Sequence, residues 1–326
     1  MILIISENDD ASTDQVLEWL RYYKIKFLRI NNNNFFDFFH LAIDSVGKTS
    51  FKLKSKISEI NNSKISGYWY RRGRLSLSID LLKEQKIKGL SVSSNSFLIN
   101  EANSITELIY NEFHNKTKSI GNINENNTNK LVNLKIAKES GLDIPNTWVI
   151  TSKIELINLL EIHKRLLTKP ITQRGLYFEN EEINFDGQSN IVNRKHLKLF
   201  PDNFPPTLFQ NYIHKAFELR IFYFDGELYA SAIFSQLDAM TKVDFRNYNF
   251  QKPNRTPPFK LPKFLSDSIK VFMRKIKMKS GSLDVLVSTD KKYYFLEVNP
   301  IGQFYQVSYP CNYYLERRIA QYFQND

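Results

Sequence analysis

The chain has 326 residues, of which 42% are hydrophobic and 14% aromatic, and Cys311 is its only cysteine. This length and composition favour a folded protein of two or three domains, and a single cysteine excludes an internal disulfide framework. No stretch approaches the ~20 consecutive apolar residues of a membrane helix, and the apolar start Met1–Ile5 is too short for a secretory signal. We therefore expect a cytoplasmic protein that makes no membrane contact.

The formal net charge of the chain is +11. A basic protein favours anionic partners, which include nucleotide phosphates, nucleic acid and acidic peptides. The histidines include no close pair, and a single cysteine is present to join them. The composition therefore disfavours a zinc site.

The first third of the chain begins with a strand–helix–strand pattern. We expect a buried strand at Ile2–Ile5, a helix capped by Ser12 that runs to about Tyr23, and a strand at Lys26–Ile30. This order predicts a small α/β domain. Because no G-x-G-x-x-G follows the first strand, we assign it no dinucleotide.

One short segment resembles the end of a phosphate-binding P-loop, Gly47-Lys48-Thr49. The motif needs a glycine where Ala42 stands, and a strand pattern follows where a helix should begin. We reject the P-loop interpretation.

Two arginines, Arg71 and Arg72, follow an aromatic strand that ends near Tyr70. Arginine suits the bidentate binding of carboxylates and phosphates, so these residues either bind a substrate or lie in a solvated basic loop. A helix is expected at about 101–114, before an asparagine-rich linker at 122–129. We expect residues 1–117 to form the N-terminal domain.

The middle of the chain places two lysines at the ends of expected elements. A helix is expected over Lys130–Ser140, capped by Thr128 or Asn129, and a strand that ends at Lys169 follows it. Lysines so placed either frame a polyphosphate or lie on ordinary surface. We assign residues 118–207 to a central lobe.

The last part of the chain, residues 208–326, is expected to form a further lobe. A strand is expected at 208–213, and a hairpin at 217–234 surrounds the strong turn pair Asp225-Gly226. Glu218 and Arg220 share an aromatic strand face. Such charges either are functional or form a simple cross-strand ion pair.

Two less informative segments follow this hairpin. Residues 235–262 are polar, lack periodicity and include Arg246, so they form either a loop over a site or a disordered segment. A helix expected at 266–279 has a basic outer face. We interpret that face as solvated, with a nucleic-acid or membrane patch as the alternative.

A hairpin near the C-terminus carries the clearest chemistry. If Asp290-Lys291 is a two-residue loop, Asp284 lies directly across from Glu297, and Asn299 shares the face of Glu297. Two carboxylates and an amide oxygen suit Mg²⁺. The alternative is an exposed hairpin whose acids lie apart in water.

The order of these motifs resembles the ATP-grasp ligases over essentially the whole chain. Within them the chain most resembles the ribosomal-peptide maturases of the microviridin, or graspetide, type, and closest of all those of the grasp-with-spasm systems. The closer resemblance lies in the segments 68–72, 215–220 and 243–248. It implies an N-terminal pre-ATP-grasp α/β domain and two α+β lobes, central and C-terminal, that hold a nucleotide.

The resemblance also implies roles for individual residues. Arg220 and Arg246 would act in catalysis, and Arg71 and Arg72 would bind substrate. Glu218 would contact the nucleotide or the substrate. The remaining implied roles are Lys130 and Lys169 at the ATP phosphates; Gln210, Asn211, Tyr212 and Ile213 beside the adenine; and Asp284, Glu297 and Asn299 around two Mg²⁺ ions. The loop Thr172–Gly175 departs from the family pattern because it lacks a glycine-rich run.

By this resemblance the chain activates Asp or Glu side chains of a precursor peptide with ATP and joins them to Thr, Ser or Lys side chains. A radical SAM/SPASM enzyme and a second copy of the chain are implied as further partners, whereas nucleic acid is not. The alternatives are a ligase that adds a free amino acid to a carboxylate, and a basic binding protein that keeps the fold without the reaction.

Overall fold

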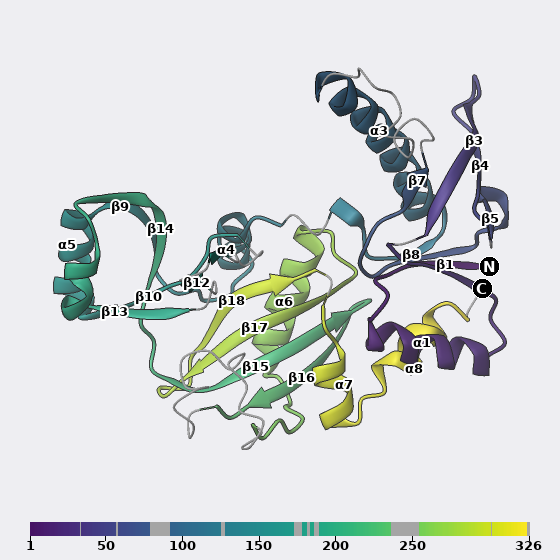
Figure 1. Ribbon diagram of the computed structural model, residues 1–326. Helices are drawn as coiled ribbons and strands as arrows, with labels where there is room; N and C mark the ends of the chain where they lie inside the picture. The colour runs from purple at the N-terminus through teal and green to yellow at the C-terminus, as the bar shows by residue number, and fades with distance from the viewer. Residues whose placement is uncertain are drawn as a thin grey trace. The chain divides into compact units, whose positions relative to one another are not determined.

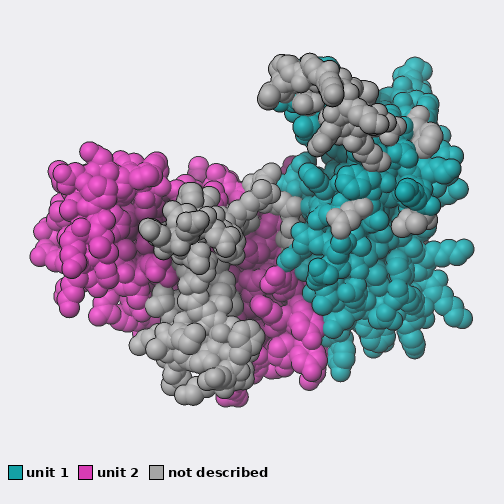
Figure 2. All heavy atoms as spheres, viewed as in Figure 1, with its two compact units in different colours: residues 1–126, 314–326 teal, residues 127–313 magenta. Residues whose placement is uncertain are grey.

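The computed structural model of the chain forms two compact units (Figure 2). Unit 1 contains Met1–Asn126 and Tyr314–Asp326, and unit 2 contains Asn127–Tyr313. The structure describes residues 1–32, 34–56, 58–78, 92–124, 128–172, 178–180, 183–185, 189–235, 254–300 and 302–324.

Unit 1 contains a parallel sheet in the order β2-β1-β6-β8. Its strands are β1 (Ile2–Ile5), β2 (Phe27–Ile30), β6 (Gly67–Tyr70) and β8 (Lys118–Ile120). Helix α1 (Ala11–Tyr22) joins β1 to β2, which confirms the predicted strand–helix–strand start. The predicted cap is wrong, because Asp10 rather than Ser12 accepts the free backbone N–H groups, those of Ser12 and Thr13.

A second sheet of unit 1 has the order β5-β4-β3-β7. Its strands are β3 (Phe35–Ile43), β4 (Thr49–Lys54), β5 (Glu59–Asn61) and β7 (Ser76–Ser78), and a 3₁₀ turn, η1, covers Asn62–Lys64. Gly47 lies in the turn between β3 and β4 with φ +79°. Strand β4 begins at Thr49 where a P-loop would begin a helix, so the rejection of that motif is confirmed.

The parallel sheet of unit 1 is covered by helices on both faces (Figure 1). Helix α3 (Val92–Lys116) packs Ile109 and Phe113 with Leu3 and Ile5 on one face. Helices α1 and α8 (Leu315–Tyr322) contact each other on the other face. None of the described helices is long and apolar enough to cross a membrane.

Unit 2 contains an antiparallel sheet in the order β13-β10-β14-β9. Its strands are β9 (Thr147–Ser152), β10 (Arg165–Thr168), β13 (Asn190–Asn193) and β14 (Asn203–Asn211). Helix α5 (Lys153–His163) buries Leu156 and Leu160 with Leu166 and Phe209 in a separate core. Smaller elements are the hairpin β11 (Phe178–Asn180) and β12 (Ile183–Phe185) and the 3₁₀ helix η3 (Arg194–Leu199).

The second sheet of unit 2 has the order β16-β15-β17-β18 and is also antiparallel. Its strands are β15 (Lys215–Phe224), β16 (Glu227–Ile233), β17 (Ser280–Ser288) and β18 (Tyr293–Asn299). Residues of α4 (Lys130–Glu139) and α6 (Lys263–Lys275) pack in one core with one face of this sheet. Helix α7 (Tyr305–Cys311) follows β18. The predicted turn is confirmed, since Asp225 and Gly226 both have positive φ, as a type I′ turn requires.

The contacts divide the chain differently from the three predicted segments. Strand β14 crosses the predicted boundary at residue 207, because it pairs along its length with β9 and β10. Residues 314–326 belong to unit 1 rather than to the C-terminal lobe. They do so because α8 carries the buried apolar residues Leu315 and Ile319.

Candidate active site

The face of the β16-β15-β17-β18 sheet opposite its helices carries a row of polar side chains. Along β17, Leu283, Val285 and Val287 enter the core with α4 and α6, so the alternating Asp284 lies on the other face. Asp284 pairs with Arg220 on β15, which pairs in turn with Ser231 on β16. Glu218 and Arg220 lie on one strand face, as the sequence predicted, and this is the face that carries Asp284.

The predicted pairing of Asp284 with Glu297 is confirmed, although the two-residue loop from which it was counted is not. The loop is longer than two residues, because Ser288 pairs with Lys292 and Lys291 has φ +63°. This shifts the register by one residue near the turn. A β-bulge at Leu296 shifts it back, so that Asp284 opposes Glu297 after all.

Asp284 is held by Arg220. The Arg220 guanidinium donates through Nη1 to Asp284 Oδ1 at 2.7 Å, and both side chains are nearly buried. Arg220 Nε is buried too, and no described residue offers it a hydrogen-bond acceptor. The guanidinium thus fixes the carboxylate with one nitrogen and keeps another donor for a further acceptor.

Glu297 is held by Lys130. Asn129 caps α4 by accepting hydrogen bonds from the N–H groups of Leu131 and Val132, which confirms one of the two predicted caps. Lys130 is the first residue of α4 and its Nζ lies 3.3 Å from Glu297 Oε2. The same ammonium donates to the carbonyl of Pro170 at 2.9 Å. Lys130 thus joins α4, the end of β10 and the carboxylate of β18.

Asn299 completes the predicted group of oxygen donors. It pairs with Ser282 and lies two residues beyond Glu297, with the core residue Val298 between them. The chain then turns back, and Gly302 donates its N–H to the Asn299 carbonyl at 3.0 Å. A Cβ on Gly302 would lie 2.8 Å from the Ser282 nitrogen, so this position needs glycine for close backbone approach.

A third ion pair, which the sequence did not predict, lies on the same sheet face as the pair of Arg220 and Asp284. Lys215 Nζ is 3.0 Å from Glu218 Oε2, and both side chains are nearly buried. An irregularity of β15 between Lys215 and Phe217 places these residues, three apart, on one face. The signal available was that Lys215 opens the segment that carries Glu218 and Arg220.

The strand predicted to lie beside the adenine is the end of β14 and the link to β15. Gln210 is buried and donates through Nε2 to Thr147 Oγ1 at 2.9 Å, and its Oε1 is also buried. Asn211 ends β14, and Tyr212 and Ile213 follow it as half-buried residues. The predicted Lys169 is half-buried directly after β10, next to the Pro170 that accepts from Lys130.

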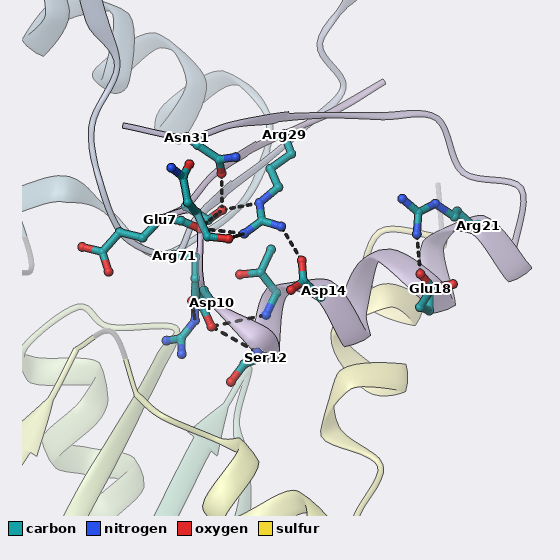
Figure 3. A network of polar contacts seen from close by, with 12 residues as sticks. Glu7, Asp10, Ser12, Asp14, Glu18, Arg21, Arg29, Asn31 and Arg71 are labelled. Atoms are coloured by element: carbon teal, nitrogen blue, oxygen red, sulfur yellow. Dashed lines mark hydrogen bonds and ion pairs between the residues drawn. The ribbon is translucent and has the colours of Figure 1, made fainter. Parts of the chain in front are cut away.

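The predicted Arg71 and Arg72 lie in unit 1, and Figure 3 shows Arg71 in a polar network of that unit. Arg71 Nε is 3.0 Å from Asp10 Oδ2, the carboxylate that caps α1, and only 3% of Arg71 is exposed. Burial lowers the pKa of Arg71 to about 10, and the neighbouring Asp10 opposes this change. Arg72 is more exposed and lies 3.8 Å from Glu7. Within unit 1, Arg71 thus orders the start of α1.

Two predictions lie outside the described residues. Arg246 falls in residues 236–253, and most of the Thr172–Gly175 loop falls in 173–177. Their roles remain those that the resemblance implies.

The oxygen donors on β17 and β18 fit Mg²⁺. Two carboxylates and one amide oxygen lie on one face, and hard cations prefer oxygen ligands. In the described part of the chain no group of three or more His, Cys, Asp or Glu side chains is placed to hold a metal. Because Mg²⁺ prefers octahedral coordination, three protein oxygens leave positions for water or phosphate oxygens.

Comparisons with known proteins bear on the fold of the chain. Residues 1–115 match a family model described as the MvdD pre-ATP grasp domain. A RiPP-associated ATP-grasp ligase of Chryseobacterium gregarium, in complex with ADP and a leader and core peptide, aligns over 99% of this chain and 95% of its own, with a TM-score of 0.78 and 24% identity. The chain has the ATP-grasp fold.

Two further similar structures come from Microcystis aeruginosa MRC. The macrocyclase MdnC, bound with its precursor peptide MdnA, has a TM-score of 0.74 and 20% identity, and covers 100% of this chain and 99% of its own. The macrocyclase MdnB has a TM-score of 0.72 and 18% identity over the same shares. No curated protein sequence matches the chain. The predicted fold class, an ATP-grasp fold with a pre-ATP-grasp domain, is confirmed.

Proposed function

We propose that the chain is an ATP-dependent ligase that crosslinks the side chains of a ribosomally made precursor peptide. The observation that carries the proposal is the row Arg220, Asp284 and Glu297 with Lys130 against it, on an ATP-grasp fold. Three similar structures are those of two macrocyclases and a RiPP-associated ligase, two of them in complex with peptide. This supports a peptide as the substrate.

In the proposed reaction, an Asp or Glu carboxylate of the peptide attacks the terminal phosphate of ATP, giving an acyl phosphate and ADP. A Thr or Ser hydroxyl, or a Lys amine, then displaces phosphate and forms an ester or amide. The first step brings like charges together, so catalysis depends on positioning and on compensating positive charge. Arg220 and Arg246 supply that charge, and Lys130 and Lys169 hold the phosphates.

Asp284, Glu297 and Asn299 would hold Mg²⁺, and we propose two ions. When bound, magnesium neutralises and orients phosphate oxygens. Gln210 and the residues to Ile213 line the adenine site, and Glu218 contacts the nucleotide or the substrate. Arg71 and Arg72 bind the acidic peptide in the proposal. The Asp10 contact of Arg71 makes Arg72 the more accessible of the two.

The test begins with a search for small acidic Thr- and Ser-rich reading frames beside the gene. Each is co-expressed with the chain, and the peptide mass is measured. We expect the loss of one water per crosslink, dependent on ATP. Asp284→Asn and Glu297→Gln should abolish this loss, because phosphoryl transfer relies on the charges that these carboxylates place.

Asp290→Asn is the matched control, since Asp290 lies in the turn of the same hairpin with its side chain 60% exposed. It should leave turnover unchanged.

Other outcomes would favour other functions. If the peptide gained the mass of an amino acid, this would support ligation of a free amino acid. Binding of nucleic acid with steep salt dependence and no ADP release would support a binding protein. Near-normal crosslinking by both carboxylate variants would refute the assigned site.

A further inference from the structure

Four charged side chains of the candidate site form two ion pairs. Glu297 is paired with Lys130 at 3.3 Å, and Asp284 with Arg220 at 2.7 Å. The four side chains are between 5% and 16% exposed. In this state each carboxylate proposed to hold metal has a cation in contact with it.

We propose that Lys130 and Arg220 are exchangeable counter-ions that prevent the site from binding a divalent metal ion unless a nucleotide binds with it. This inference rests on the proposed function and adds the order in which its ligands enter. A metal ion that reached Asp284 and Glu297 alone would compete with both cations. The metal ion would leave the charged groups of Lys130 and Arg220 nearly buried beside its double positive charge, where electrostatic repulsion is strong.

A nucleotide removes this obstacle because it offers new acceptors to both cations. Lys130 has three N–H donors and Arg220 five, and both groups accept phosphate oxygens readily. Arg220 already has a buried Nε for which no described residue provides an acceptor. As phosphates take over the cations, the carboxylates are released for the metal.

The structure also anchors the two cations near the carboxylates. Lys130 is the first residue of the capped helix α4, and its second contact is the fixed carbonyl of Pro170. Arg220 lies within β15, paired on both sides. Each cation can therefore change its partner through side-chain rotation without movement of the backbone.

The expected consequence is positive coupling between metal and nucleotide. Linkage requires the effect to be reciprocal, so each should raise the affinity of the other by the same factor. The measurement uses Mn²⁺ alone, followed by electron paramagnetic resonance, and a non-hydrolysable ATP analogue. For the full chain, we expect the analogue to raise Mn²⁺ affinity by at least about tenfold, within the range usual for such coupling.

Substitution of a counter-ion should free the carboxylates. Lys130→Met and, separately, Arg220→Met are expected to bind Mn²⁺ alone about tenfold more tightly than the unmodified chain, and to show smaller coupling, since the competing cation is gone. Both should also lose affinity for the analogue. A role confined to phosphate binding predicts only that loss, so the gain for Mn²⁺ distinguishes the proposal.

The matched control is Lys138→Met. Lys138 lies on the same helix and pairs with Asp143 at 2.7 Å, but its side chain is 61% exposed. It should leave both affinities unchanged.

Different failures have different meanings. If the unmodified chain binds Mn²⁺ equally well with and without the analogue, the counter-ion proposal is wrong while the ligase proposal stands. If it binds neither ligand, both are wrong. The coupling in the unmodified chain needs no substitution, so it decides the question even where a variant fails to fold.

Discussion

The buried pair of Lys215 and Glu218 shows how a single charge on this sheet face affects stability. Their side chains are 6% and 10% exposed and lie 3.0 Å apart. Lys215→Met should destabilise unit 2 by about 3 kcal/mol, because removal of one partner leaves the other charge poorly compensated in a buried position. Chemical denaturation measures the change in the free energy of unfolding.

The double variant Lys215→Met/Glu218→Gln tests the reason for that loss. It should recover much of the stability, since no uncompensated charge remains. Lys138→Met breaks a pair that is exposed on both sides and should cost no more than about 1 kcal/mol. A double variant no more stable than the single one would show that Lys215 acts through packing rather than through Glu218.

Gly302 sets the position of the chain that follows Asn299. A Cβ at Gly302 would lie 2.8 Å from the Ser282 nitrogen and 2.9 Å from its Oγ, so Gly302→Ala must move the turn away from β17. We expect a destabilisation of about 1–3 kcal/mol, as for overpacking in a core, and weaker binding of Mn²⁺ with the ATP analogue. Thermal unfolding measures the loss of stability, and electron paramagnetic resonance of Mn²⁺ measures the loss of binding.

Gly281→Ala is the control for this substitution. It is the neighbour of Ser282 on β17, but a Cβ there meets no atom closer than 3.4 Å. It should fold and bind like the unmodified chain. Equal effects of the two substitutions would mean that β17 tolerates no added methyl group, and that Gly302 has no special part.

At the level of elements, the hairpin of β17 and β18 shows what the sequence can and cannot predict. Alternation places Asp284 and the core residues of β17 on opposite faces, and this was predictable. The length of the turn was not, because it depends on Lys291 adopting positive φ, which few residues other than glycine do at low cost. The bulge at Leu296 was not predictable either. The longer turn and the bulge shift the register in opposite directions, so their effects cancel at Glu297.

Helix α4 gives a test of how an element positions a functional side chain. Asn129→Ala removes the acceptor for two N–H groups of the first turn, which holds Lys130. We expect a loss of about 1 kcal/mol in stability, the usual value for such a cap. Weaker binding of the ATP analogue should accompany it because the first turn then frays. Unfolding curves and titration calorimetry measure the two effects.

Ser152→Ala is the corresponding control. Ser152 caps α5 through the N–H of Ile154, and α5 carries none of the proposed site residues. It should lower stability to a similar extent and leave affinity for the analogue unchanged. If both variants bind the analogue equally well, the cap of α4 does not position Lys130.

At the scale of the whole molecule, the sequence order does not indicate which unit the last residues join. Strand and helix patterns identify local elements, but they do not indicate which distant core an isolated amphipathic helix joins. Residues 314–326 follow the lobe with the candidate metal site, yet they complete unit 1. Arg317 Nε donates to the Tyr23 hydroxyl at 3.0 Å, and the Tyr322 hydroxyl donates to the Ser119 carbonyl at 3.3 Å.

This arrangement predicts that a substitution near the C-terminus weakens the N-terminal domain. Ile319 is 2% exposed on α8, so Ile319→Ala should cost about 3 kcal/mol, as is usual for a large-to-small change in a core. Hydrogen exchange should locate the lost protection in β1, β6 and α1, while β15 to β18 remain protected.

Two substitutions of the same type make the test specific. Ile269→Ala removes a fully buried side chain of α6 and should lower protection in β15, β17 and β18. Ile162→Ala changes an isoleucine that is 72% exposed on α5 and should alter neither unit by more than about 0.5 kcal/mol. If Ile319→Ala instead lowers protection in β15 to β18, the last helix stabilises the lobe that precedes it in sequence. The division of the chain into these two units would then be wrong.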